Sequence, residues 1–221
     1  MRIELAPSIL SADFARLAEQ LACMESGGAD AVHVDVMDGR FAPNMTIGPP
    51  VVAALKKATR LPLDCHLMIV EPERWIDTFV KSGASRLTVH AEAATHLHRT
   101  IESIKAAGAE AGVAINPGTP LSAVEEILTE LDVLLVMSVN PGFSAQKFIP
   151  SAVDKVRRLA LLCEQHGVAP LIQVDGGVSA SNAGELVHAG ARSLVAGAAV
   201  FGAADPAEAV RVLRRAAEAA R

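Results

Sequence analysis

Hydrophobic residues recur along the chain in short runs rich in Val, Ile and Leu, and most runs are followed by a segment with helical spacing. Such runs predict buried β-strands, and apolar residues spaced by three or four predict amphipathic helices. Eight runs can be counted, and they begin near Ile3, Ala31, Leu61, Arg86, Ala111, Val133, Leu171 and Ser193. The pattern therefore predicts eight repeats of a strand and a helix.

Helices are predicted between these strands at 14–26, 72–82, 96–107, 123–131, 151–166, 180–189 and 206–220. Several begin at a capping residue or a proline and end at a glycine, as at Gly27, Gly83, Gly108, Gly167 and Gly190. Eight units without a leftover segment favour a closed parallel (β/α)8 TIM barrel. The alternative is an open flavodoxin-like sheet, which usually has fewer strands.

Composition narrows the class of protein further. With 221 residues and 51% hydrophobic residues, the chain suits one barrel domain over 1–221. The net charge of -5, with both signs interspersed, provides no basic stripe for nucleic acid. Three cysteines without a C-x-x-C pair suit a reducing compartment. Without a signal peptide or a membrane-spanning run, we expect a soluble cytoplasmic protein that binds neither nucleic acid nor membrane.

Polar residues gather at the carboxyl ends of the predicted strands, where barrels place their catalytic sites. His33 and Asp35 are two residues apart in the second strand and therefore point to the same side. His66 lies in the third strand at a matching depth, and Asp175 ends the seventh. Because a buried aspartate needs a cation or a proton, the four residues predict a site for one divalent ion such as zinc, iron, manganese or cobalt.

Other residues near these strand ends have two interpretations. Met37, Met68 and Met137 could simply fill the core, or they could form a water-poor wall beside a charged planar intermediate. His90 could be a further ligand, but a supporting or structural role is the preferred interpretation. Cys65 alternates with His66 along the strand, so it should face the surrounding helices.

Small residues follow the last three strands. The turns contain Gly142, Phe143, Ser144 and Ala145, then Gly176 and Gly177, and finally Gly197 and Ala198. In barrels, backbone N–H groups of the last loops frequently hold a phosphate, although tight turns need glycine in any case. The chain has neither a dinucleotide-binding G-x-G frame nor a P-loop. These turns predict a ligand that carries a phosphate.

Six strings, in order through nearly the whole chain, resemble the ribulose-phosphate 3-epimerase family. They are APSILSADF, VHVDVMDG, FAPNMTIGP, LDCHLMI, VMSVNPGF and VDGGV. The resemblance implies a metal ion bound by His33, Asp35, His66 and Asp175, with the two aspartates as acid and base. It further implies that Ser8 contacts the substrate, as does the ligand His66. The phosphate would lie over the loops at 142–145, 176–177 and 197–198.

Two departures from the family pattern fall in the phosphate loops. The family usually reads NPGFGGQ where this chain has Ser144 and Ala145, and AGSA where this chain has Ala198 in place of the serine. Every residue involved keeps its backbone N–H group. The loss of a hydroxyl at Ala198 and the added bulk of Ser144 bear on phosphate affinity, while the metal and acid–base residues are intact.

The resemblance implies reversible epimerisation of D-ribulose 5-phosphate and D-xylulose 5-phosphate at C3, through an enediolate. It also implies a homo-oligomer in carbohydrate metabolism, with the pentose phosphate pathway as one setting. An epimerase for a related ketose phosphate, such as allulose 6-phosphate, is the closest alternative. A non-catalytic phosphosugar-binding barrel is another. A decarboxylase of related barrels is disfavoured, because its Asp-x-Lys-x-x-Asp string is absent.

Overall fold

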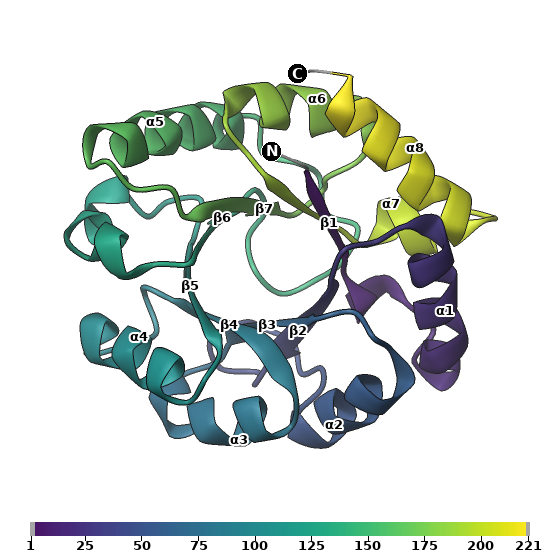
Figure 1. The fold of residues 1–221 in the computed structure, drawn as a ribbon, viewed down its shortest axis with the longest axis horizontal. Helices are drawn as coiled ribbons and strands as arrows, with labels where there is room; N and C mark the ends of the chain where they lie inside the picture. The colour runs from purple at the N-terminus through teal and green to yellow at the C-terminus, as the bar shows by residue number, and fades with distance from the viewer. Residues whose placement is uncertain (1–2, 220–221) are drawn as a thin grey trace.

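The computed structural model describes residues 3–219, which form a ring of eight parallel strands surrounded by helices (Figure 1). The strand order is β1-β8-β7-β6-β5-β4-β3-β2. A parallel bridge between Ser8 and His33 joins the two ends of this order, so β1 and β2 close the ring. The predicted (β/α)8 barrel is therefore confirmed, and the open flavodoxin-like sheet is wrong.

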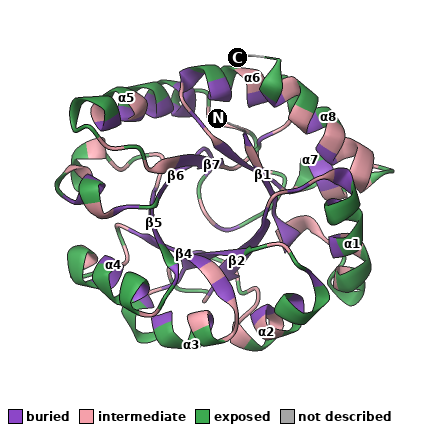
Figure 2. Ribbon diagram, in the orientation of Figure 1, coloured by how far each residue is buried: buried purple, intermediate pink, exposed green. Residues whose placement is uncertain are grey.

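The strands are short and mostly buried. They are β1 (Glu4–Pro7), β2 (Val32–Met37), β3 (Leu63–Met68), β4 (Ala84–His90), β5 (Glu110–Ile115), β6 (Val133–Met137), β7 (Leu171–Asp175) and β8 (Ser193–Ala196). Alternate side chains face the barrel interior and the helices. Cys65 is buried in the main hydrophobic cluster that the strands share with the helices, as expected from its alternation with His66. Figure 2 shows the buried ring of strands inside helices whose outer faces are exposed.

The helices agree with most of the predicted ranges. They are α1 (Leu17–Gly27), α2 (Pro49–Ala58), α3 (Ile76–Lys81), α4 (Leu97–Ala106), α5 (Ser151–Gln165), α6 (Ala180–Ala189), α7 (Ala198–Phe201) and α8 (Pro206–Glu218). The ranges predicted from 14 and 72 both start with a separate 3-10 turn, at Phe14–Arg16 and Pro72–Arg74. The last residue of the range 206–220 lies outside the described residues.

Two details of the helical prediction were wrong. The range 123–131 contains the 3-10 helix η5 (Glu125–Glu130) and no α-helix, because Val124, with a φ of -125°, interrupts the helical conformation. The list of helices omitted α2, which starts with two prolines in its first turn, where no intrahelical N–H is needed. α1 ends at Gly27, as expected, and Gly28, with a φ of 86°, follows it as the C-cap residue. Gly27 is needed for packing, since an added Cβ would lie 2.7 Å from Ala207 O in α8.

A polar network fills the barrel interior below the strand ends. Arg86 Nη1 donates to Glu4 Oε1 over 2.9 Å and lies 3.6 Å from Asp64 Oδ2. Gln173 Nε2 donates to Asp64 Oδ2 over 2.8 Å and to Ser193 Oγ over 2.9 Å. Buried charges are stable when they are paired and hydrogen-bonded. This network holds Asp64 directly beneath the candidate site.

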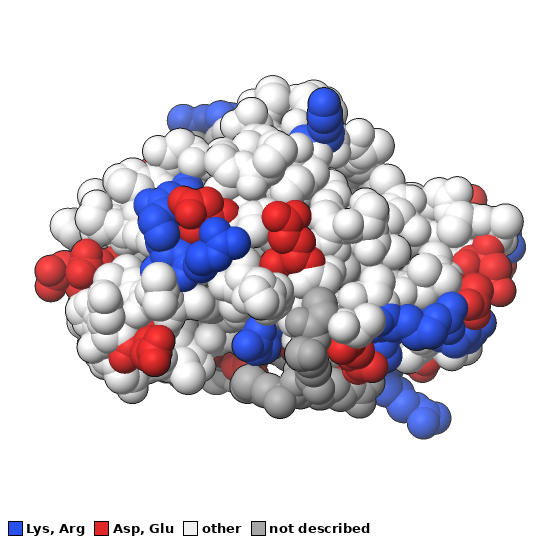
Figure 3. Space-filling model, turned by 90° about the horizontal axis from the view of Figure 1, so that it is seen from above, with Lys and Arg blue, Asp and Glu red and all other residues white. Residues whose placement is uncertain are grey.

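The outer surface carries both signs of charge side by side. On the face in Figure 3, basic side chains lie next to acidic ones. On α8, for example, Arg211 and Arg215 both pair with Glu208 over 2.7 Å. Within residues 3–219, every helix is too short or too polar to cross a lipid bilayer.

Candidate active site

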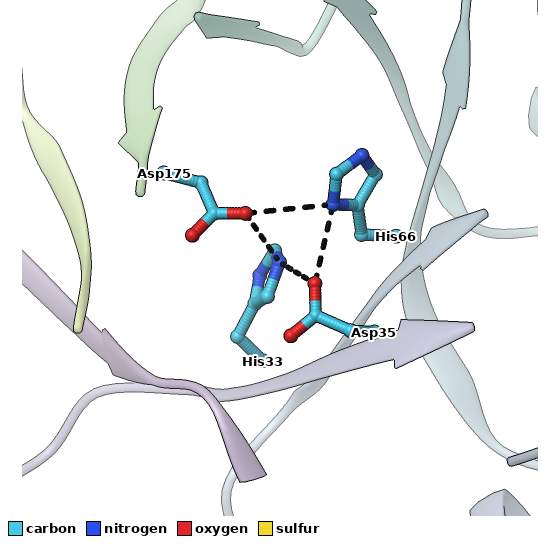
Figure 4. Close-up of side chains that lie close together, drawn as sticks. All are labelled: His33, Asp35, His66 and Asp175. Atoms are coloured by element: carbon cyan, nitrogen blue, oxygen red, sulfur yellow. Dashed lines mark ion pairs between the residues drawn. The ribbon is translucent and has the colours of Figure 1, made fainter. Parts of the chain in front are cut away.

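Four polar side chains from three strands meet inside the barrel (Figure 4). β2 contributes His33 and Asp35, β3 contributes His66, and β7 contributes Asp175. Asp35 Oδ1 lies 3.5 Å from His33 Nε2 and 3.4 Å from His66 Nδ1. Asp175 Oδ2 lies 3.9 Å and 3.7 Å from the same two nitrogens. The structure thus brings together all four residues that the sequence selected.

The four groups fit a divalent metal ion. Their nearest ligand atoms all lie within 4.8 Å of one another. Ligands about 2.0 to 2.2 Å from a tetrahedral ion are themselves roughly 3.3 to 3.6 Å apart, close to the distances found here. Within residues 3–219, His33 Nε2 and His66 Nδ1 are buried without a hydrogen-bond partner, which costs free energy unless another group binds them. Two imidazoles and two carboxylates suit a first-row divalent ion.

The two aspartates occupy different electrostatic environments. Burial raises the pKa of Asp35, but His33 and His66 outweigh it and hold the pKa far below its usual range. Burial, together with the nearby charge of Asp35, raises the pKa of Asp175 to about 7. Burial lowers the pKa of His66, whereas the carboxylates beside His33 raise its pKa in spite of burial. A bound cation would lower the pKa of both aspartates.

Each candidate histidine ligand makes a second contact, through the ring nitrogen that faces away from the site. His33 Nδ1 lies 2.9 Å from Asp64 Oδ2, and His66 Nε2 lies 2.8 Å from His90 Nε2. The ring planes of His66 and His90 are inclined by 24°, with centroids 4.9 Å apart, so the two rings meet edge to edge. His90 lies outside the four-residue group and contacts Glu92 through its second nitrogen, at 3.1 Å. Its position agrees with the preferred supporting role.

A pocket of about 400 Å³ opens above Asp35 and Asp175. Met37, Met68 and Met137 line it, and at most 5% of each methionine is exposed. The three residues therefore fill the top of the barrel interior and also form an apolar wall of the pocket. His33 and His66 are completely buried beneath it.

The predicted phosphate loops line the same pocket. Their residues are Gly142, Phe143, Ser144, Ala145, Gly176, Gly177, Gly197 and Ala198. Gly176 has a φ of 118°, and an added Cβ would lie 2.8 Å from Val139 N, so only glycine fits there. Ala145 has a φ of 57° at a position where the family string has glycine. A left-handed conformation costs a non-glycine residue roughly 1 to 2 kcal/mol.

Ser8 also lines the pocket. Its hydroxyl donates to Asp35 Oδ2 over 2.5 Å, while Asp35 Oδ1 faces the two histidines. Ser8 thus orients Asp35 by occupying one of its two carboxylate oxygens.

Sequence reasoning missed several residues of the site. Ser11 lines the pocket beside Gly197, and its Oγ is buried without a hydrogen-bond partner. Gln146 Nε2 donates to Asn140 O and Phe143 O, over 2.7 Å and 2.9 Å, and so holds the loop after β6. Asp64 lies two residues before His66 on β3, so its side chain points to the same side of the strand. This spacing could have placed Asp64 next to the site. No local pattern singled out Ser11 or Gln146.

The fold and the site together define a (β/α)8-barrel enzyme whose acidic groups face a small pocket rimmed by glycine-containing loops. Comparison with known proteins specifies the family. A sequence model described as the ribulose-phosphate 3 epimerase family matches residues 4–201. The chain therefore belongs to the ribulose-phosphate 3-epimerase family and is an enzyme of that type.

Individual relatives agree with this assignment. The chain is 56% identical over 214 residues to the chloroplastic ribulose-5-phosphate-3-epimerase of Arabidopsis thaliana, covering 96% of this chain and 76% of that one. It is 51% identical over 213 residues to ribulose-phosphate 3-epimerase of Bacillus subtilis, covering 96% and 98%. Among solved structures, 3-hexulose-6-phosphate synthase from Salmonella typhimurium superposes with a TM-score of 0.68 at 20% identity, over 99% and 100% of the two chains. That last similarity concerns the fold alone.

Proposed function

We propose that this chain interconverts D-ribulose 5-phosphate and D-xylulose 5-phosphate at C3, with one divalent ion held by His33, Asp35, His66 and Asp175. The family and the names of its relatives support the reaction. One observation carries the assignment of the site. Among the residues that the structure describes, the buried nitrogens His33 Nε2 and His66 Nδ1 have no hydrogen-bond partner, and they face two carboxylates across a gap that suits a metal ion.

Epimerisation at C3 requires the removal of the hydrogen that C3 carries. The C3 hydrogen lies next to the C2 carbonyl, so its removal gives an enediolate. When bound, a divalent ion would act as a Lewis acid toward the negative charge that develops on the substrate oxygens. Inversion at C3 requires that one aspartate accepts the proton on one face while the other returns a proton on the opposite face.

Asp35 and Asp175 are suited to this exchange because they reach the site from separate strands, β2 and β7, and because they differ in proton affinity in the metal-free site. The pKa of Asp35 lies far below its usual range, while burial and Asp35 raise the pKa of Asp175 to about 7. One carboxyl group can then begin as the base while the other begins as the acid, and the reverse reaction exchanges these roles. Ser8 keeps Asp35 in a fixed orientation by donating to Oδ2.

The residues that line the pocket would exclude water and bind the phosphate and the sugar. Met37, Met68 and Met137 form an apolar wall that would exclude water from the enediolate. The phosphate would lie over the loops at 142–145, 176–177 and 197–198, where backbone N–H groups can approach closely. Ser8 and His66 would contact the sugar, since Ser8 lines the pocket and His66 lies just below it.

Two alternatives are separated by experiment. Purified protein should be assayed with D-ribulose 5-phosphate and with allulose 6-phosphate, after its metal content is measured. Faster turnover of the pentose, with about one divalent ion per chain, is the expected result. Preference for the hexose would favour the related ketose-phosphate epimerase. Phosphosugar binding without turnover by metal-loaded protein would favour the non-catalytic barrel.

Three further features are proposals, of which only the oligomer comes from the resemblance. We expect one catalytic domain over 1–221, a homo-oligomer and a cytoplasmic location. Light scattering of purified protein tests the assembly, and fractionation of cells tests the location.

A further inference from the structure

We propose that His90 and Glu92 are positioning residues that hold His66 in the one tautomer able to bind a metal ion. This inference rests on the proposed function, because it concerns a proposed ligand. His66 Nε2 lies 2.8 Å from His90 Nε2, and His90 Nδ1 lies 3.1 Å from Glu92 Oε2. Both rings are completely buried. The three side chains thus form a hydrogen-bonded chain that begins directly behind the site.

One arrangement of protons satisfies every contact in this chain. A hydrogen bond between two ring nitrogens needs one N–H group and one lone pair. A neutral imidazole carries one proton, and Nδ1 of His66 must lack it to bind a metal ion. Nε2 of His66 then carries the proton and donates to His90 Nε2. His90 must therefore carry its proton on Nδ1, where the Glu92 carboxylate accepts it.

Glu92 is itself fixed by the loop that follows β5. Asn116 N donates to Glu92 Oε1 over 2.8 Å, and the hydroxyl of Thr119 donates to the same oxygen. Lys155 of α5 holds this loop through Nζ, which donates to the carbonyls of Asn116, Pro117 and Thr119 over 3.0 Å, 2.7 Å and 2.8 Å. The loop after β5 therefore holds Glu92 through Oε1, which leaves Oε2 to face His90.

His33 is supported in a similar way, but the supporting carboxylate contacts its ring directly. Its Nδ1 lies 2.9 Å from Asp64 Oδ2, and its Nε2 faces the site without a partner. Both histidines therefore present an unpartnered nitrogen to the site and are supported by a carboxylate behind. For His33 the carboxylate acts directly, while for His66 it acts through His90. Carboxylates in this position orient histidine ligands and select their tautomer.

Loss of Glu92 should weaken this control of the tautomer. The proton of His90 could then move to Nε2, where it would meet the N–H group of His66. His66 would have to place its proton on Nδ1 or turn its ring, and either change competes with metal binding. Removal of such a supporting partner typically weakens metal affinity or activity by about 10 to 100-fold.

The test is a titration of metal-free protein with Co(II) alone, monitored by the visible spectrum. Glu92→Ala should bind Co(II) roughly 10 to 100-fold more weakly and show an altered spectrum. Glu92→Gln should lose less Co(II) affinity, because the amide oxygen can still accept a hydrogen bond from His90 Nδ1. The matched control is Glu102→Gln, whose parent residue lies 3.4 Å from His98 in an exposed pair on α4. This control should match the parental protein in affinity and spectrum.

The outcomes separate the two proposals. If the parental protein binds no Co(II), the metal proposal fails and the positioning proposal fails with it. If the parent binds Co(II) while Glu92→Ala and Glu92→Gln show unchanged affinity and spectra, only the positioning proposal is overturned. A lower melting temperature with unchanged Co(II) binding likewise indicates a purely structural role. If Glu92→Ala does not fold, Glu92→Gln decides by the same measurements.

Discussion

Asp35 and Asp175 face the same two imidazole nitrogens, although 140 residues separate them along the chain. Asp35 Oδ1 lies 3.5 Å and 3.4 Å from His33 Nε2 and His66 Nδ1, and Asp175 Oδ2 lies 3.9 Å and 3.7 Å from them. The two carboxylates come from β2 and β7, so they reach the centre of the barrel from separate strands. This arrangement allows one pair of residues both to hold an ion and to exchange a proton.

The first prediction concerns metal content. Purified protein should contain about one divalent ion per chain. Chelation should abolish epimerisation, and adding metal should restore it. His66→Ala should lose the ion because it removes one of four ligands, whereas His98→Ala, on the exposed face of α4, should retain it. Elemental analysis and a coupled epimerase assay measure both properties, and full activity in metal-free protein would contradict the proposal.

The second prediction concerns the two aspartates. Asp35→Asn and Asp175→Asn should each lose nearly all epimerisation, because an amide neither accepts nor delivers the required proton. The remaining aspartate could still exchange the C3 proton of one epimer with solvent deuterium, which NMR detects. Metal content must be measured in each variant, since only metal-loaded protein tests proton transfer.

Two results would count against the two-aspartate mechanism. Both metal-loaded variants could epimerise at nearly the parental rate, in which case neither aspartate is essential. Alternatively, one variant could exchange both epimers equally while the other exchanges neither. A single base would then act, and the assignment of opposite faces would be wrong.

The third prediction concerns the phosphate loops. Ala198→Ser restores the hydroxyl of the family string and should change KM only modestly, because backbone N–H groups are proposed to hold the phosphate. One neutral hydrogen bond contributes about 0.5 to 1.5 kcal/mol, or roughly a 2 to 13-fold change. Steady-state kinetics measure this effect. A collapse of kcat would show that the phosphate binds elsewhere.

The fourth prediction concerns Gly176. Gly176→Ala should destabilise the fold, because residue 176 has a φ of 118° and a Cβ would meet Val139 at 2.5 Å and 2.8 Å. Steric strain of this kind typically costs about 1 to 3 kcal/mol. Gly118→Ala is the control, since its Cβ would have nothing within 4 Å. Thermal unfolding compares the two variants, and equal melting temperatures would refute the argument.

The fifth prediction concerns pH and Asp38, in the loop after β2. Burial raises the pKa of Asp38, but backbone N–H groups of Val70, Phe41 and Arg40 outweigh it and lower the pKa. The ionised form therefore stabilises the fold above the unfolded-state pKa of about 3.9, and this stabilisation is lost as the pH falls through the lower folded-state pKa.

Because solvent screens this partly exposed carboxylate, Asp38→Asn should be less stable at pH 7 by about 0.5 to 1 kcal/mol, and its difference from the parent should shrink below about pH 4. Denaturant unfolding at several pH values measures this difference. Asp77→Asn is the control, because Asp77 is 76% exposed and pairs with the exposed Lys81 at 3.5 Å. A difference that stays constant with pH would exclude this role of the Asp38 charge.

The sequence by itself determined the features that depend on local spacing. The recurring apolar runs predicted the eight strands, and strand alternation separated Cys65 from His66 correctly. The same alternation placed His33 and Asp35 on one side of β2. Such features are predictable because the pleat of a strand and the pitch of a helix repeat over a few residues.

Only the tertiary structure decided which distant groups meet. Closure of the barrel brings Asp175 of β7 to Asp35 of β2. The pairing of β4 with β5 brings the loop after β5 to Glu92, and the register of β2 against β3 places Asp64 behind His33, a contact that the spacing of the strand residues suggested only in part. These contacts depend on the stagger and tilt of eight strands together, because a closed barrel fixes which residues share a level inside it. Local sequence patterns carry no information about that stagger.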